Sequence, residues 1–454
     1  MLRVAVVGSG PSGVYTAQGL VQQSQVPEVR VDVLDRLPCP YGLVRYGVAP
    51  DHEKIKSLQN NLRAVLEDER VRFLGGVRIG PDGLPAARLR ELYHAVVYCV
   101  GAATDRHLGV PGEELAGSWS ATEFVSWYSA HPDSVADGFV LGARSAVVIG
   151  VGNVAVDVTR ILARGTAELS PTDMPQAALT ALAASEVTEI SMVGRRGPSQ
   201  ARFTTKELRE LGALPDTEVI VDPRELELDP QYNEPSGLPA ANRRNVEVLR
   251  GWAATPPRGA ARRIRLRFFL RPVELLGDGE EGEGRRVGAV RFERTVPDGH
   301  GGVTGTGQYE DIDAQLVLRS VGYRGVPLDG LPFDAEHGTV PHLAGRVVRD
   351  GTIAPGEYVA GWIKRGPTGV IGTNRPCAKE TVTSLLEDAG MLVRRELPED
   401  PLVALRAAGL TPVEWAGWQA IERAEAELGA SLGRGVVKLP DWTSLLAAAR
   451  TARP

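Results

Sequence analysis

The residues with the clearest chemistry stand at the start of the chain. Residues 4–13, VAVVGSGPSG, place a short apolar run directly before the spacing Gly8-x-Gly10-x-x-Gly13. In such a turn the first glycine permits a tight bend, the second lets a pyrophosphate approach the backbone, and the third lets the next helix pack on the strand. Unpaired N–H groups at the helix start then face the phosphate. An isolated turn of this kind can also simply join a strand to a helix, and that alternative stays open here.

The residue that ends the next strand indicates what the first turn would hold. Residues 29–35, VRVDVLD, alternate as a strand does and end in Asp35. A carboxylate about twenty residues past the glycines can accept hydrogen bonds from ribose hydroxyls, and it disfavours a 2′-phosphate. We therefore expect FAD or NAD rather than NADP at the first turn. The alternative is a strand-end Asp that only begins a turn.

A second turn of the same design ends differently. Residues 146–155, AVVIGVGNVA, combine a strand with the spacing GxGxxA, and the strand expected over 187–193 runs into Arg195 and Arg196. Guanidinium groups can bind a 2′-phosphate through two parallel hydrogen bonds. The second turn is therefore expected to prefer NADP(H) over NAD, with a solvated basic turn as the alternative. We also expect Gly165 to cap the helix that follows this turn.

Two ionisable groups outside the turns could act in chemistry. Residues 38–52, PCPYGLVRYGVAPDH, are expected to form an ordered loop, and Asp51 is expected to cap the helix that follows. His52 would then lie in the first helical turn, where the helix dipole favours a neutral imidazole. Glu210 lies on a helix expected over 204–213, together with Glu207. On position alone, an exposed histidine and a solvated acidic face are the alternatives.

These groups need a scaffold of parallel sheets with helices on both sides. We expect an α/β fold with two Rossmann-like dinucleotide-binding domains in a glutathione-reductase-like arrangement, the NADP domain being inserted into the FAD domain. The predicted boundaries are 1–104 for the first part of the FAD domain, 105–322 for the NADP domain, and 323–454 for the second part with its tail. Strands over 93–102 and 315–324 would cross between the domains. Residues 357–387 predict a strand, a glycine-rich turn, and a helix whose start is marked by Thr373.

The remaining segments carry less chemistry. Residues 222–310 are expected to form strands with long surface turns, including the loop 277–284. Most of their arginines would be solvated, with a basic patch formed by some of them as the alternative. The tail, 395–454, is expected to be helical, and no chemistry can be named for it.

Composition excludes several classes. The 454 residues carry a net charge of −6, which gives no case for binding nucleic acid. No apolar run reaches the roughly 18 residues of a membrane helix, and no secretory signal is expected. Three cysteines without a CxxC pattern indicate neither a disulfide framework nor a cluster ligated by this chain. The cytoplasm is the expected compartment, and no metal site is predicted from the seven histidines.

Two cofactor sites in one chain suggest hydride transfer from a nicotinamide to a flavin. At this point the chain resembles a ferredoxin–NADP+ reductase of the adrenodoxin-reductase type, most of all its actinobacterial members. The resemblance is carried by VGSGPSG at 7–13, GLVRYGVAPDH at 42–52, GVGNVAVDV at 150–158, VGRRGPSQARFTTKELREL at 193–211, RSVGYRG at 319–325 and GWIKRGPTGVIGTN at 361–374. It implies a flavoprotein that takes two electrons from NADPH and passes them singly to a small acidic iron–sulfur protein of the ferredoxin type.

The resemblance also implies residue roles. FAD would be bound by Gly8, Gly10, Pro11, Ser12, Gly13, Asp35, Leu43, Val77, Trp362, Gly369, Val370 and Ile371. NADP(H) would be bound by Arg106, Val151, Gly152, Asn153, Val154, Arg195, Arg196, Glu207 and Gly369. His52 and Glu210 match a pair that orients hydride transfer near the nicotinamide. The iron–sulfur protein would dock on arginines such as Arg243 and Arg244. Asp35 departs from the family pattern, in which Glu is usual.

Other functions share parts of this pattern. A flavin monooxygenase has both turns, but its FxGxxxH fingerprint is not present between them here. A pyridine-nucleotide disulfide reductase would need the missing CxxC. An NADPH diaphorase or a non-enzymatic NADP(H) sensor would keep nucleotide binding, although a sensor would have no use for an ordered flavin-facing loop.

Overall fold

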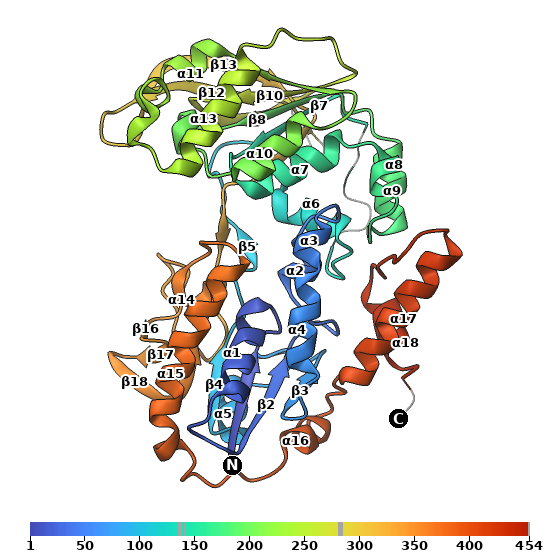
Figure 1. Cartoon of the computed structure of the whole chain (residues 1–454), viewed down its shortest axis with the longest axis vertical. Coiled ribbons are helices and arrows are strands. Elements are labelled where there is room, and N and C mark those ends of the chain that lie inside the picture. Colours follow the sequence, from blue (N-terminus) through green and yellow to red (C-terminus); the bar gives the residue numbers. More distant parts are fainter. Residues whose placement is uncertain (135–138, 140–141, 280–284, 453–454) are drawn as a thin grey trace. The chain divides into compact units, whose positions relative to one another are not determined.

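Two parallel sheets organise the structure, a computed structural model that describes residues 1–134, 139, 142–279 and 285–452. The chain divides into two units, each built around one sheet (Figure 1). Unit 1 comprises Met1–Thr104, Ser129–Asp133 and Gly322–Pro454, and unit 2 comprises Asp105–Tyr128 and Ser134–Val321. Unit 2 is therefore inserted in the sequence of unit 1. The return of Ser129–Asp133 to unit 1 was not predicted.

Unit 1 contains a seven-stranded sheet in the order β16-β17-β18-β4-β1-β2-β3. The parallel strands are β1 (Leu2–Val7), β2 (Val29–Leu34), β3 (Val71–Leu74), β4 (Ala95–Tyr98) and β18 (Thr352–Val359), while β17 (Arg346–Arg349) and β16 (His342–Leu343) add an antiparallel edge. The central strands are rich in valine because both faces of a parallel sheet are covered. Val4 and Val7 of β1, for example, belong to core clusters on opposite faces.

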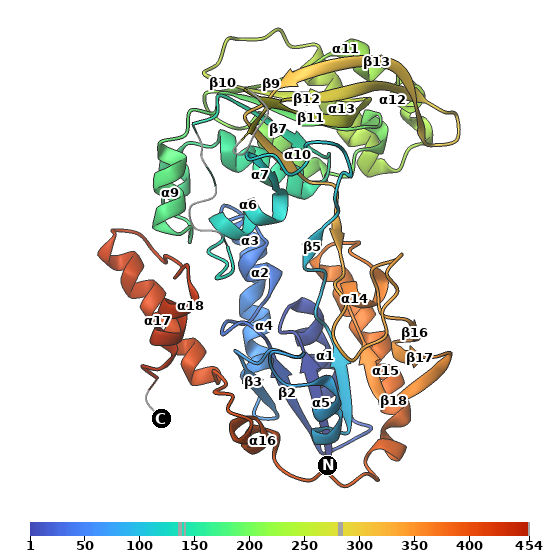
Figure 2. The same ribbon diagram turned by 180° about the vertical axis from the view of Figure 1, so that it is seen from behind.

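Helices cover both faces of this sheet. On one face lie α1 (Pro11–Gln22), α4 (Leu58–Leu66) and α15 (Asn374–Leu392), with α1 and α15 in contact. The other face is covered by α5 (Ala86–Leu92), seen from behind in Figure 2, and by α16 (Pro401–Ala407). The tail adds α17 (Trp415–Ser431) and α18 (Trp442–Ala449), so its predicted helical character is correct. In the described residues no helix combines the length and apolarity needed to cross a bilayer.

Unit 2 contains a six-stranded parallel sheet in the order β6-β14-β7-β8-β10-β9. Its strands are β6 (Ser118–Ser120), β14 (Leu316–Arg319), β7 (Ser145–Ile149), β8 (Glu189–Val193), β10 (Arg262–Arg267) and β9 (Thr217–Val221). Its helices are α6 (Ala121–Tyr128), α7 (Asn153–Ala163), α8 (Thr166–Leu169), α9 (Gln176–Ala183), α10 (Thr205–Gly212), α11 (Pro223–Glu227), α12 (Pro230–Asn233) and α13 (Ala240–Ala253). A three-stranded antiparallel sheet joins β11 (Leu270–Asp278), β12 (Arg286–Pro297) and β13 (Val303–Asp313).

Several local predictions were wrong. Residues 38–52 contain a short helix, α2 (Leu43–Tyr46). In place of the single helix expected after Asp51 there are two, α3 (Glu53–Lys56) and α4. The N-cap of α3 is His52 rather than Asp51. Gly165 does not end α7. Its φ of −67° is ordinary, and it caps the start of α8.

Two longer segments also differ from expectation. Residues 223–253 form helices α11 to α13 rather than strands, because prolines at the first helical position of α11 and α12 start helices as well as turns. The expected strands 93–102 and 315–324 correspond to β4 and β14, which are internal to unit 1 and unit 2. The chain leaves unit 1 within β5 (Thr104–Asp105) and returns to it just before β15 (Tyr323–Arg324), and it also crosses between the units on either side of Ser129–Asp133. Of the expected loop 277–284, residues 280–284 lie outside the described part of the chain.

Candidate functional site

The first glycine turn, between β1 and α1, combines two packed glycines with an open one. Gly8 has a φ of +109°, and a Cβ there would lie 2.5 Å from the carbonyl oxygen of Cys99. A Cβ at Gly13 would lie 1.8 Å from the oxygen of Gly8. At Gly10, by contrast, the nearest atom to an added Cβ is 3.9 Å away. The turn is therefore held closed at its ends and left open at the glycine that a pyrophosphate would approach.

The start of α1 offers a buried polar group that has no partner within the described ranges. Pro11 is the first helical residue, where its missing N–H costs nothing. The hydroxyl oxygen of Ser12 is buried and has no hydrogen-bond partner among the described residues. A buried polar atom without a partner is unfavourable unless a ligand satisfies it. Beside the first-turn N–H groups of a twelve-residue helix, this hydroxyl suits an anionic ligand.

Asp35 is fixed by the turn itself. Its Oδ2 accepts hydrogen bonds from the backbone N–H of Ser9 at 2.8 Å and from the Ser9 hydroxyl at 2.6 Å, and its Oδ1 accepts from the N–H of Leu37 at 2.9 Å. A carboxylate offers about four acceptor positions. The carboxylate is thus oriented before any ligand arrives and keeps capacity for a ribose hydroxyl.

The loop after β2 returns to the turn. Gly42 has a φ of +50°, and a Cβ there would lie 2.9 Å from the Cα of Gly10, so the two backbones are in close contact. The side chain of Leu43, at the start of α2, is 39% exposed. Val77 has its side chain in the core and donates its N–H to the oxygen of Asp35 at 2.8 Å. The structure therefore brings residues of 42–43 to the first turn, and it places the side chain of Val77 in the core.

The segment 361–374 begins against the same turn. A Cβ at Gly361 would lie 2.5 Å from the Ser12 hydroxyl oxygen. Trp362 donates its indole N–H to the oxygen of Thr368 at 3.2 Å, which closes the loop. Gly369 has a φ of +81°, Val370 is 63% exposed, and Ile371 packs partly on the core beneath α1. An exposed valine on an ordered loop leaves apolar surface available to a ligand ring.

The second glycine turn, between β7 and α7, repeats the geometry of the first. Gly150 has a φ of +143°, and a Cβ there would lie 2.2 Å from the oxygen of Ser320. Gly152 has open space around it, with nothing within 4 Å of an added Cβ. The turn is tied to the segment after β8, because Val151 accepts the N–H of Arg202 at 2.9 Å and Asn153 accepts that of Thr204 at 2.8 Å. Val154 lies in the first turn of α7.

Three arginines beside this turn lack acidic partners. Arg195, Arg196 and Arg202 form no ion pair with a carboxylate of the described residues. The pKa of Arg196 is lowered by burial and, next, by the positive charges of Arg195 and Arg202. Mutual repulsion of this kind is relieved by an anion, so the cluster fits a phosphate group. Arg106, expected to belong to the same site, is exposed.

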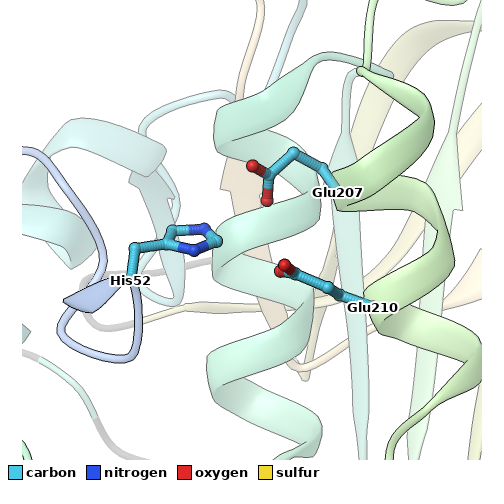
Figure 3. Close-up of side chains that lie close together, drawn as sticks. All are labelled: His52, Glu207 and Glu210. Atoms are coloured by element: carbon cyan, nitrogen blue, oxygen red, sulfur yellow. The ribbon is translucent and has the colours of Figure 1, made fainter. Parts of the chain in front are cut away.

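Helix α10 carries Glu207 and Glu210, one turn apart, and Figure 3 shows both carboxylates extending from it. Thr204 caps this helix by accepting the N–H of Glu207. The guanidinium group of Arg160, on α7, lies 3.4 Å from a Glu207 oxygen and 3.3 Å from a Glu210 oxygen. The interpretation of Glu207 as part of a solvated face is therefore wrong. His52, also labelled in Figure 3, begins α3 of unit 1 as its N-cap.

Arg160 was missed by sequence reasoning. It is 1% exposed and also pairs with Asp157 at 2.9 Å, one turn earlier on α7. Buried arginines are rare without acidic partners. An arginine three residues after an aspartate, inside an otherwise apolar helix, was the available signal.

A depression of about 1070 Å³ in unit 2 lies beside these glutamates. It is lined by parts of α10, of α13 and of the segment 200–206. Its lining includes the cations Arg202, Lys206, Arg209 and Arg244 against the single acid Glu210. This surface is therefore positively charged although the whole chain is negative.

Comparison with known proteins agrees with this geometry. The pyridine nucleotide-disulphide oxidoreductase family matches residues 2–209. NADPH-ferredoxin reductase FprA of Mycobacterium tuberculosis is 44% identical over 98% of both chains. The mitochondrial NADPH:adrenodoxin oxidoreductase of Arabidopsis thaliana is 41% identical over 99% of this chain and 95% of its own length. The chain belongs to this family of NADPH–ferredoxin reductases of the adrenodoxin-reductase type. The structure of M. tuberculosis FprA in complex with NADPH matches at 42% identity with a TM-score of 0.92 over 99% of each chain.

Membership confirms the predicted family and the α/β fold with two Rossmann-like sheets. The cysteines separate this chain from members that use a redox-active disulfide. Cys39, Cys99 and Cys377 are free and buried, and burial raises the pKa of Cys39 to about 11 and that of Cys99 to about 12. These two thiols are protonated at neutral pH, so they are not reactive thiolates.

Proposed function

We propose that the protein is an NADPH-dependent ferredoxin reductase with FAD on the first glycine turn and NADPH on the second. When bound, the two cofactors supply the redox chemistry, a hydride from the nicotinamide and single electrons from the flavin to an iron–sulfur partner. The chain's own residues bind, orient and shield these groups. The observation that carries the proposal is the contrast between the two turns. Asp35 lies beside one, and beside the other lie three arginines that pair with no carboxylate in the described part of the chain.

The first turn fits FAD. Gly10 leaves room for the pyrophosphate, and the buried hydroxyl of Ser12 and the first N–H groups of α1 would bind it. Asp35, already oriented by Ser9, would accept the ribose hydroxyls. The remaining proposed FAD residues lie around this turn or on the loops that return to it: Gly8, Pro11, Gly13, Leu43, Val77, Trp362, Gly369, Val370 and Ile371.

The second turn fits NADPH. Arg195 and Arg196, with Arg202 beside them, would hold the 2′-phosphate that distinguishes NADPH from NADH. Gly152 and the start of α7 would face the pyrophosphate, together with Val151, Asn153 and Val154. Glu207 and the exposed Arg106 complete the proposed set, and Gly369 of unit 1 is its remaining member by the family pattern.

We assign His52 and Glu210 to the orientation of hydride transfer, as the family pattern implies. Hydride transfer needs no proton at that step, so a positioned neutral imidazole suits an orienting role better than acid–base work. Arg160 supports this role from within unit 2, because it neutralises Glu207 and Glu210 and limits how their side chains can move.

The proposed electron acceptor is a small acidic ferredoxin-type protein. The cationic depression on α10 and α13 includes Arg244, one of the two arginines expected to dock it, and complementary charge favours rapid encounter. Arg243 donates to the oxygen of Ser236 at 3.3 Å and lies one residue earlier on α13. We keep the cytoplasm as the proposed compartment, since three free thiols suit a reducing environment.

The deciding experiment is NADPH-dependent reduction of candidate ferredoxins by the purified protein, followed by ferredoxin absorbance. We expect a yellow protein that reduces an acidic ferredoxin with NADPH and far more slowly with NADH. A colourless protein that cannot be reconstituted with FAD would contradict the proposal, and equal rates with NADH would contradict the role of Arg195 and Arg196.

Two other activities share the scaffold. A diaphorase would reduce artificial acceptors but no ferredoxin, and a sensor would bind NADP(H) without turnover. A flavin monooxygenase would couple oxygen uptake to oxidation of an organic substrate. The same purified protein separates these cases in three assays.

A further inference from the structure

A buried ion pair links the tail to the loop beside the first glycine turn. The guanidinium group of Arg45, on α2, makes two hydrogen bonds to the carboxylate of Glu425, on α17, at 2.6 and 3.1 Å. The two side chains are 5% and 2% exposed. They stand 380 residues apart in the sequence. The same guanidinium lies 5.0 Å from the ring centre of Trp418, also on α17.

A second buried cation holds the backbone of the same residue. Lys438, which follows α17, is 2% exposed and donates from its Nζ to the carbonyl oxygen of Arg45 at 2.6 Å. The carboxylate of Glu425 also accepts the N–H of Leu439 at 3.0 Å, and this bond fixes the segment that carries Lys438 to α17. The tail therefore binds both the side chain and the backbone of Arg45.

Helix α2, which carries Arg45, is too short to be stable without contacts to the rest of the chain. Helix α2 has four residues, far fewer than a helix requires to be stable by itself. It begins after Gly42, whose backbone touches Gly10 of the glycine turn, and its first residue is the partly exposed Leu43. A shift of α2 would therefore move atoms that line the opening of the first turn.

Packing alone does not explain this choice of residues. A buried ion pair contributes little net stability, and apolar side chains of similar size often do as well or better. What a guanidinium–carboxylate pair with two hydrogen bonds adds is a fixed relative geometry. The charged side chains of Arg45, Glu425 and Lys438 meet at α2, so the fixed geometry of their hydrogen bonds holds α2 in position.

We propose that Glu425 and Lys438 are positioning residues for the flavin, and that the tail is a clamp holding α2 against the first glycine turn. The inference deepens the proposed function and rests on FAD binding at that turn. It gives a role to the tail, where the sequence alone indicated no chemistry.

The test uses the full-length protein purified with its FAD and compares Glu425→Gln with Glu422→Gln. Glu422 lies one turn earlier on α17 and pairs with Arg63 at 2.9 Å at a more exposed place, so it is a matched control. FAD release is followed by the rise in flavin fluorescence, and unfolding is followed separately by far-UV circular dichroism. Visible circular dichroism of the bound flavin reports its surroundings. Arg45→Lys keeps a buried positive charge but cannot make the two parallel hydrogen bonds of a guanidinium group. It replaces Glu425→Gln in the test if that variant does not fold. Lys438→Gln removes the buried cation at position 438, and Lys438→Arg tests whether a different cation there restores FAD binding.

We expect Glu425→Gln and Arg45→Lys to weaken FAD binding about tenfold. They should release FAD below the temperature at which they unfold, and alter the flavin's visible dichroism. Glu422→Gln should match the wild type, and Lys438→Arg should hold FAD better than Lys438→Gln. Variants that keep wild-type FAD affinity, or that lose FAD only as they unfold, would overturn the clamp and leave the proposed function standing. A wild-type protein that binds no FAD would overturn both.

Discussion

At the scale of single residues, Arg160 is the feature with the most direct consequence. It is nearly fully buried and faces three carboxylates, those of Asp157, Glu207 and Glu210. Removing it would take a buried cation away from these three carboxylates, which is more costly than removing one member of an exposed pair. Because Glu210 is a proposed orienting residue, the loss should appear in chemistry as well as in stability.

We expect Arg160→Gln to lower the free energy of unfolding by about 3 kcal/mol. Hydride transfer from NADPH should slow about tenfold, which corresponds to about 1.4 kcal/mol in the barrier. Denaturant titration measures the first effect, and rapid mixing followed at the flavin absorbance measures the second. Arg164→Gln, at the end of the same helix and paired with Glu168 at 3.4 Å, is the control and should cost less than about 1 kcal/mol. Equal effects of the two variants would refute the positioning role.

Residue types alone suggested residues for the proposed cofactor sites, but they did not suggest the groups that support those residues. Asp35 and the Arg195–Arg196 pair could be assigned because their distance from a glycine turn along the chain fixes their place at a sheet edge. Arg160 and Glu425 could not, because each acts through a partner brought near by folding, and one sequence does not reveal such pairs. Whether the assigned residues bind as proposed stays a prediction.

At the scale of elements, the segment Ser129–Asp133 shows how the tail fastens part of the chain to unit 1. Lys438 donates to the oxygen of Ser129 at 3.2 Å, and the indole N–H of Trp442 donates to Asp133 at 2.7 Å. Between them, the ring of His131 packs 5.0 Å from that of Tyr46 and accepts the N–H of Asp133 at 3.1 Å. Burial, and then the charge of Arg36, lower the pKa of His131 to about 4.

This histidine should make stability depend on pH. The unfolded chain binds a proton near pH 6.5, whereas the folded chain resists it down to about pH 4. The folded form therefore binds fewer protons in that window, and the free energy of unfolding should fall as pH drops through it, by up to about 3 kcal/mol.

Denaturant titrations at pH 7, 6, 5 and 4 on wild type and His131→Asn would measure this effect. The pKa values of His94 and His342 are also lowered by burial, so the difference between the two proteins isolates His131. A difference that does not change with pH would contradict the prediction.

Parallel strands and the helices that follow glycine turns were the most predictable elements, because a continuous valine run and a glycine spacing are local signals. The helices over 223–253 were not, since proline starts a helix and a turn equally well. The break between α3 and α4, at Ser57, also has no clear sequence marker.

At the scale of the whole molecule, charge is unevenly distributed. The chain carries −6 overall, yet the depression on α10 and α13 presents four cations and one acid. This surface, unlike the net charge, would attract the proposed acidic partner at long range.

We expect kcat/KM for an acidic ferredoxin to fall about tenfold between low salt and 0.3 M salt, because exposed charges are screened. Arg244→Gln should weaken that dependence. Arg263→Gln should not, since Arg263 lies outside the depression and already pairs with Glu189 at 2.6 Å. Ferredoxin reduction measured against ionic strength decides this, and a salt-insensitive rate would exclude electrostatic docking.

The insertion of unit 2 into the sequence of unit 1 affects the order in which the nascent chain can fold. The ribosome finishes unit 2 while the first sheet still lacks β18, and Glu425 follows Arg45 by 380 residues. At about 5–20 residues per second, roughly 20–80 s separate the synthesis of these two partners. During that time the first glycine turn exists without the segments that close around it. Loading of the proposed FAD is therefore expected to come late, after Glu425 has been synthesised.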